Sequence, residues 1–175
     1  MSESFWSDAG VEPKRQYRWL FYMGHVPQWV VKKVTKPSFE VSQTTHEFLI
    51  HKFHYPGRVT WNEVKVTLAD PVNPDSAATM LKVLQNSGYV LPLDPNTTQT
   101  LSKKRAVTAL GHVAIEQYGA EEDEVIEKWV LRNAWVKDVA LGELAYDGDE
   151  MVDVELTIVY DWAEMTIGLG RGLPT

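Results

Sequence analysis

The segment from Met151 to Glu164 alternates between apolar and polar residues over most of its length. The apolar side chains recur at every second position: Val152, Val154, Leu156, Ile158 and Tyr160. A period of two is typical of a β-strand with one buried and one wetted face. The preceding Asp147-Gly148 pair favours a tight hairpin turn. Because similar patterns recur along the chain, we predict a mainly β protein, which must protect the edges of its sheets.

The chain has 175 residues and a mass of 19.9 kDa, which suits one domain with its own core. It has no cysteine, which excludes disulfides, thiolate metal ligands and thiol nucleophiles. No stretch approaches the roughly 20 apolar residues that span a bilayer, so we expect no membrane insertion. The N-terminus lacks the basic-then-apolar order of a signal peptide, so we expect no export by that route.

The net charge also restricts the function. It is -7 at pH 7, whereas proteins that grip nucleic acid normally carry a basic face. Tight binding of nucleic acid is therefore disfavoured, although proximity to it is not. An acidic balance that merely keeps the protein soluble is the simpler interpretation of the charge taken alone.

We expect an N-terminal arm over residues 1–14, a body of strands and a flexible C-terminal tail over residues 165–175. Phe5 and Trp6 stand out in the otherwise polar arm and suggest that it docks on its own body or on a neighbour. Strands are predicted at 16–23, 28–35, 39–41, 46–55, 59–69, 112–118 and 124–133, with 134–144 as a connection or a short strand.

One helix is predicted at about residues 74–87. Asn73 can cap its start and Gly88 can end it in a left-handed conformation. Apolar residues recur at helical spacing between these two positions: Ala77, Met80, Leu81 and Leu84. This stripe is expected to lie against the sheet.

Residues that could support catalysis or metal binding are few. His46, His51 and His54 are close in sequence, but in a strand His51 points away from the other two. Among the acids, only Glu127 and Asp161 have a partly apolar setting, and no pair is suited to acid–base chemistry. We therefore expect a protein that is not an enzyme, with no catalytic residue, no cofactor and no bound metal.

The chain is rich in tryptophan, with seven residues. Trp19 and Trp129 are interpreted as core residues. Trp6 and Trp135 fit the core and an interface equally well, because tryptophan is enriched where chains meet.

Two regions resemble the inner tail tube proteins of contractile-tailed bacteriophages. One is YPGRVTW at 55–61, continued by VKVTLAD at 64–70. The other combines LRNAW at 131–135, GELAYD at 142–147 and VELTIVYDW at 154–162. The resemblance covers about residues 16–164 and depends on the order of elements and the residues at strand ends. Related tube subunits occur in type VI secretion and other contractile injection systems.

This resemblance implies a β-sandwich or barrel-like tail tube fold with the helix at 74–87 on one flank and a protruding hairpin at about 46–58. It also implies hexameric rings that stack into a hollow tube, through which DNA passes without sequence-specific binding. The expected partners are other copies of the chain and the tail sheath, baseplate and tail terminator proteins. The expected location is the tail of a phage virion assembled in the host cytoplasm.

The contacts expected between subunits and rings involve aromatic and apolar residues, together with one arginine: Phe5, Trp6, Phe48, Ile50, Phe53, Tyr55, Arg58 and Trp135. The 46–58 segment is the expected stacking element, since apolar residues on both of its faces suit a position between neighbours; an ordinary paired strand is the alternative. A baseplate–tube junction protein or a secretion-system tube protein would share the fold. A monomeric β-barrel that binds a small apolar ligand is the alternative from another class.

Overall fold

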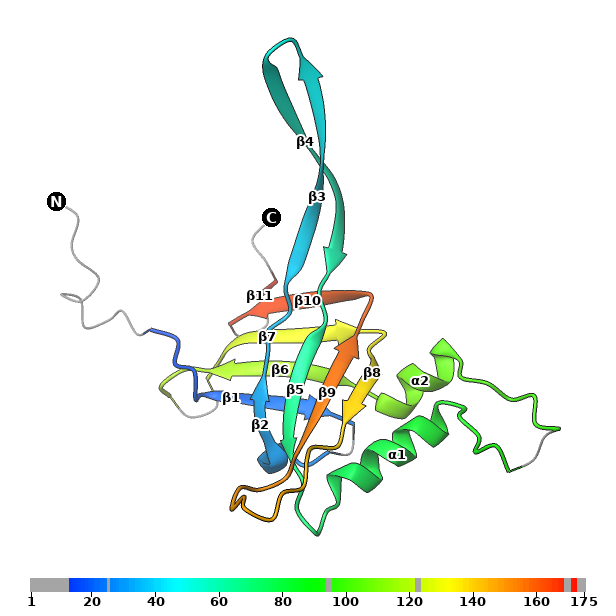
Figure 1. Cartoon of the computed structure of the whole chain (residues 1–175). Helices are drawn as coiled ribbons and strands as arrows, with labels where there is room; N and C mark the ends of the chain where they lie inside the picture. Colours follow the sequence, from blue (N-terminus) through cyan, green and yellow to red (C-terminus); the bar gives the residue numbers. More distant parts are fainter. Residues whose placement is uncertain (1–12, 25, 94–95, 122–123, 169–170, 173–175) are drawn as a thin grey trace.

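The computed structural model describes residues 13–24, 26–93, 96–121, 124–168 and 171–172. They form a body of two β-sheets from which a long hairpin projects (Figure 1). The strands of one sheet run across those of the other, as in an orthogonal sandwich. The predictions of a mainly β fold and of a sandwich-like core are confirmed.

Both sheets of the body are antiparallel. The five-stranded sheet has the order β1 (Trp19–Met23), β6 (Val113–Tyr118), β7 (Val125–Arg132), β10 (Trp162–Ile167) and β11 (Arg171–Gly172). The four-stranded sheet has the order β2 (Val31–Val34), β5 (Val64–Ala69), β9 (Asp153–Val159) and β8 (Trp135–Ala140). A 3-10 helix, η2 (Gln28–Val30), leads into β2. β6 and β7, which correspond to the strands predicted at 112–118 and 124–133, pair as an antiparallel hairpin.

The core lies between the two sheets. In the middle of the four-stranded sheet, every second residue is buried: Val64, Val66 and Leu68 on β5 and Val154, Leu156 and Ile158 on β9. The facing sheet contributes Phe21, Val113, Ile115 and Leu131. Full burial of such a side chain stabilises a fold by about 1.5–3 kcal/mol. The alternation read from the sequence therefore marks the core of the molecule.

Two predicted strands are divided by corners. The strand expected at 59–69 is interrupted at Asn62, so that its first part belongs to the hairpin and its second part is β5. The alternating segment 151–164 is interrupted at Tyr160, where the chain leaves the four-stranded sheet and enters the five-stranded sheet as β10. A period-two pattern continues across such a corner and does not reveal it. β10 also extends into the segment 165–175, which was expected to be a flexible tail.

The helix predicted at 74–87 is confirmed as α1 (Ser76–Asn86), and Gly88 follows it with the expected positive φ, at +110°. Its predicted cap is wrong. The residue that caps α1 is Asp75, whose carboxylate accepts a hydrogen bond of 2.7 Å from a backbone N–H of the first turn, whereas Asn73 lies before the helix. Asp and Asn are equally good N-cap residues, so the sequence was compatible with a helix that starts after either Asn73 or Asp75.

A second helix, α2 (Lys103–Leu110), corrects the expectation of a single one. It is short, and Leu110 is its only fully buried residue, so it has no clear apolar stripe in the sequence. The hydroxyl of Ser102 caps it by accepting the backbone N–H of Arg105 at 3.3 Å. The two helices pack together next to β8 (Figure 1). In the described ranges, neither one is long and apolar enough to cross a membrane.

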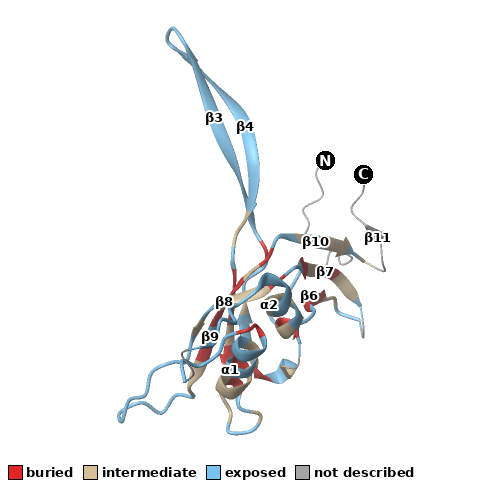
Figure 2. Cartoon of the chain, turned by 90° about the vertical axis from the view of Figure 1, so that its right-hand side faces the viewer, coloured by how far each residue is buried: buried red, intermediate tan, exposed pale blue. Residues whose placement is uncertain are grey.

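The projecting hairpin consists of β3 (Phe39–Phe48) and β4 (His51–Trp61), which among the described strands pair only with each other. Figure 2 shows it exposed along almost its whole length, while the buried residues gather in the body. The hairpin expected at 46–58 is therefore present and longer than predicted. The prediction that 46–55 forms one strand is wrong, because the chain reverses between Phe48 and His51.

Candidate assembly surfaces

The base of the hairpin is joined to the body by aromatic packing. Phe39 and Trp61 form its first pair, and their rings meet edge to face with centroids 5.4 Å apart. Trp61 also packs on Tyr160, with centroids 6.0 Å apart, and Tyr160 is buried at the corner before β10. The backbone N–H of Asn62 donates to the carbonyl of Ser38 at 2.8 Å. The base is therefore fixed by the core, and the outer part projects from a rigid support.

A β-bulge lies between the base and the outer part of the hairpin. Val41 pairs with Val59, but Gln43 pairs with Pro56. Between these two pairs β4 advances by one residue more than β3. An extra residue changes the phase of the side chains on its strand, so those beyond it point to the opposite face from the one that simple alternation predicts.

Ser42 and Gly57 make this bulge possible. The hydroxyl of Ser42 accepts a hydrogen bond of 2.8 Å from the backbone N–H of Arg58. A Cβ added to Gly57 would lie 2.3 Å from the Oγ and 2.9 Å from the carbonyl oxygen of Ser42. Only glycine allows the two strands to approach this closely at the bulge.

Beyond the bulge the two faces of the hairpin differ in chemistry, since directly paired residues share a face. One face, here called the aromatic face, consists of Thr44, His46, Phe48, His51, Phe53 and Tyr55. The other, here called the polar face, consists of Gln43, Thr45, Glu47, Lys52, His54 and Pro56. The expectation of apolar residues on both faces is therefore wrong for this outer part, because the turn pairs Phe48 with His51 and so places the aromatic rings on one side.

The predicted contact residues of the hairpin are exposed on this outer part. Phe48, Phe53 and Tyr55 share the aromatic face, with exposed fractions of 61%, 48% and 56%. Ile50 is at the tip and is 90% exposed. Arg58 is in the bulge. A contiguous exposed apolar surface of this kind indicates a binding surface.

The histidines are arranged differently from the prediction. His46 and His51 lie on the aromatic face, whereas His54 lies on the polar face. A single strand over 46–55 would place His46 and His54 on one side, but the chain reverses between Phe48 and His51. Within the described residues, no three His, Cys, Asp or Glu side chains are grouped so that they could hold a metal ion.

Glu127 on β7 is the centre of a buried polar cluster. It forms ion pairs with Lys14 and with Lys36, the latter at 2.8 Å, and accepts the indole N–H of Trp129. Lys36 also donates to the side chain of Gln117 at 2.5 Å. Burial by itself would raise the pKa of Glu127, but the hydrogen bonds from the two lysines and the indole prevail and lower the pKa to about 2. Glu127 is therefore a charged structural anchor.

This cluster fixes two connecting stretches of the chain to the five-stranded sheet. Lys14 lies shortly before β1, and Lys36 lies between β2 and the hairpin. The second acid that the sequence singled out also has a structural role. Asp161 accepts hydrogen bonds from Lys103 at 2.7 Å and from Asn133 at 2.7 Å, which lower its pKa and tie α2 to the corner before β10.

Trp135, the remaining predicted contact residue of the body, lies apart from the hairpin. It is half-buried on β8, the edge strand of its sheet, and lines a groove of about 810 Å³ between that strand and the two helices. The groove is lined mainly by apolar side chains, among them Leu84, Leu101, Ala106 and Val139. Phe5 and Trp6 lie outside the described residues.

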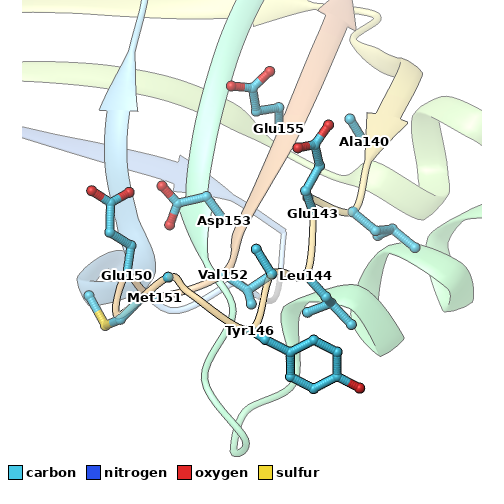
Figure 3. A pocket seen from close by; sticks show the side chains of 13 residues that line it. Ala140, Glu143, Leu144, Tyr146, Glu150, Met151, Val152, Asp153 and Glu155 are labelled. Atoms are coloured by element: carbon cyan, nitrogen blue, oxygen red, sulfur yellow. The ribbon is translucent and has the colours of Figure 1, made fainter.

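The segment 141–152 between β8 and β9 forms a second exposed feature, which the sequence analysis did not select. It borders a pocket of about 1120 Å³. Figure 3 shows the carboxylate of Glu143 on the upper side of this pocket and the side chains of Leu144 and Tyr146 on its lower side. Leu144 is 89% exposed and Tyr146 is fully exposed. The mixture of acidic and apolar residues in 141–152 was the sequence signal that could have identified this exposed segment.

The buried ion pairs predict a specific pH dependence. The pKa of Glu127 lies below its usual value of 4.5, so its contribution to stability is complete above about pH 4.5 and is lost as the pH falls through about 2. Glu127→Gln should therefore lower the free energy of unfolding at pH 7, and the difference from wild type should shrink toward pH 2. Urea unfolding at several pH values measures this. A difference that stays constant with pH, or one equal to that of the exposed control Glu121→Gln, would contradict the role of Glu127.

No protein-family model and no curated protein matches the sequence. Several solved structures are similar over nearly the whole chain. A chain in the extended sheath–tube complex of the PVC extracellular contractile injection system is 14% identical, with 95% of this chain and 99% of that chain covered and a TM-score of 0.64.

Two structures from the anti-feeding prophage are also similar. For the tube-terminating cap the identity is 15%, the covered shares are 91% of this chain and 95% of that chain, and the TM-score is 0.65. For the baseplate the identity is 15%, the shares are 89% and 97%, and the TM-score is 0.57. Together with the sandwich, the flanking helices and the projecting hairpin, these similarities show that the chain has the tail tube fold of contractile injection systems.

Proposed function

We propose that this chain is a structural, non-enzymatic subunit of the tube of a contractile injection assembly. Its copies form hexameric rings, and the rings stack into a hollow tube inside a contractile sheath. The observation that carries the proposal is an exposed hairpin with one aromatic face on a tail tube fold. The anti-feeding prophage baseplate, whose structure was 6-fold symmetrised, supports the hexameric ring.

The hairpin supports a role in assembly, because an isolated hairpin has little stability of its own. A two-stranded ribbon buries no core of its own and is marginally stable in water. Most of its outer residues are exposed, including Phe48 and Ile50. A second copy that covers the aromatic face would remove this apolar surface from water.

The body also has edges that a neighbour could cover. β2 and β8 are the outer strands of the four-stranded sheet. Outer strands present backbone N–H and C=O groups that can pair with another chain. Head-to-tail contact between identical subunits closes into a ring when the rotation allows it. We assign Trp135, together with Phe5 and Trp6 of the arm, to these contacts, and Phe48, Ile50, Phe53, Tyr55 and Arg58 to the contacts between rings.

The assembly that we favour is the tail of a contractile phage, from the resemblance of the sequence to inner tail tube proteins. In that setting the tube conducts DNA into the host, and its partners are the sheath, baseplate and tail terminator proteins. The net charge of -7 supports a conduit, because a basic bore would retain the polymer by counterion release. The subunit would assemble in the host cytoplasm and reside in the virion.

Two other roles use the same fold. A baseplate–tube junction or end protein is supported by the similarity to the cap and baseplate structures, and a secretion-system or extracellular injection tube by the similarity to the PVC complex. Long self-assembled tubes favour a tube subunit, whereas rings that never extend favour the junction. The apolar groove beside Trp135 supports a monomeric ligand binder, which size-exclusion chromatography would reveal as a persistent monomer.

The purified protein is expected to form rings and stacked tubes, because both the hairpin and the sheet edges need partners. Negative-stain electron microscopy over a range of concentrations measures this directly. If only dispersed monomers are present at high concentration, even with sheath and baseplate proteins added, the proposed function is wrong.

Replacement of Phe48, Ile50 and Phe53 by serine should leave the subunit folded and abolish stacking. These side chains are exposed in the single chain, so their loss removes contacts between rings and little of the core. The matched control changes Gln43, Thr45 and Lys52 of the polar face to serine and should retain tubes. Tube length by microscopy and thermal unfolding by circular dichroism separate assembly from folding. Tubes of normal length in the first variant would show that the hairpin is not the stacking element.

A further inference from the structure

The aromatic face of the hairpin offers hydrogen-bond donors and apolar surface, and it carries no carboxylate. Its polar atoms include the imidazoles of His46 and His51 and the hydroxyl of Tyr55. A neutral imidazole has one N–H donor and an imidazolium has two. Glu47 lies on the polar face, where Lys52 pairs with it at 2.7 Å. The aromatic face is therefore suited to a partner that exposes apolar side chains together with free acceptors.

The segment 141–152, here called the acidic loop, has that complementary chemistry. It contains four carboxylates and no basic residue: Glu143, Asp147, Asp149 and Glu150. Among the described residues, none of the four has an ion pair. The loop also exposes Leu144, Tyr146 and Met151, the last by 70% (Figure 3). Carboxylates accept hydrogen bonds and do not donate when ionised.

The two surfaces lie at opposite ends of the molecule. The hairpin projects from one end of the body, and the connection from β8 to β9 lies toward the other end (Figure 1). A hairpin cannot reach the acidic loop of its own chain from there. In a head-to-tail stack the two ends belong to neighbouring copies, so each copy supplies both halves of the contact.

We propose that the aromatic face of the hairpin docks on the acidic loop of a second copy in the adjacent ring. The inference rests on the proposed function, since it names the surface that receives the stacking element. The rings of Phe48 and Phe53 cover the exposed apolar side chains of the loop, and the imidazoles of His46 and His51 face its carboxylates.

The bulge has a defined part in this contact. The two-residue turn pairs Phe48 with His51, which places Phe53 and Tyr55 on the face of Phe48. The bulge at Gly57 and Arg58 joins this register to that of the base, where Val41 pairs with Val59. The close approach of Gly57 to Ser42 thus lets the docking face keep the register of the turn while the base keeps its own. Single exposed polar contacts are weak, but every subunit of a ring repeats them, and their effects combine across the stack.

The test adds carboxylates to one face of the hairpin at a time. His46→Glu with His51→Glu places two carboxylates on the aromatic face, opposite those of the acidic loop. Gln43→Glu with His54→Glu places two on the polar face of the same hairpin and is the matched control. Tubes are scored by sedimentation and negative-stain microscopy, rings by native mass measurement, and folding by thermal unfolding. We expect loss of tubes with intact rings in the first variant and normal tubes in the control.

Charge reversal in the acidic loop provides the second arm. Glu143→Lys with Glu150→Lys, introduced into the chain that carries His46→Glu and His51→Glu, should restore the tubes, because opposite charges then face each other again. Restoration requires that the two surfaces meet, and a folding defect in either parent variant cannot produce it.

Each outcome has a defined meaning. Normal tubes in the aromatic-face variant, equal loss of tubes in that variant and the polar-face control, or no restoration by the reversed loop while wild-type tubes are normal would overturn this inference and leave the proposed function standing. Absence of tubes in the wild-type protein would overturn both.

Discussion

A ribbon of two strands cannot bury its own side chains, and this constraint governs the molecule. Its base is stabilised by the contact of Phe39 with Trp61 and of Trp61 with Tyr160, which extends the core into the root of the hairpin. The ion pair between Lys36 and the buried Glu127 fixes the chain just before it. Beyond the bulge these supports end, and the aromatic face remains in water. The arrangement is stable as a whole when another copy covers that face.

Much of the secondary structure of the body could be predicted from the sequence, because its strands and α1 have regular patterns of apolar residues. Alternating apolar residues located β5 and β9, and a stripe at helical spacing located α1. Corners escaped detection, since the alternation continues through Tyr160 while the chain changes sheets. α2 escaped because a short helix at the edge of a body needs few apolar residues. These errors arise where tertiary packing decides the structure and the local pattern does not change.

The sequence identified several residues of the assembly surfaces, but it did not show how they are arranged in space. Phe48 and Phe53 were recognised as contact residues, whereas their grouping on one face depends on the turn between Phe48 and His51. The close approach of Gly57 to Ser42 is visible only in three dimensions. Glu127 was identified as an unusual acid, but its two lysine partners are distant in sequence. Long-range pairing of this kind leaves no periodic signal in a single sequence.

The central claim is that the hairpin is completed by another copy. Hydrogen–deuterium exchange of residues 39–61, compared between dispersed and assembled protein, tests it most directly. In the dispersed protein the outer hairpin should open locally and exchange fast, since its hydrogen bonds are exposed and no core covers them. We predict that assembly slows exchange most strongly in the outer part, between Gln43 and Pro56. Equal exchange rates in the two forms would show that the hairpin remains uncovered and would contradict the account.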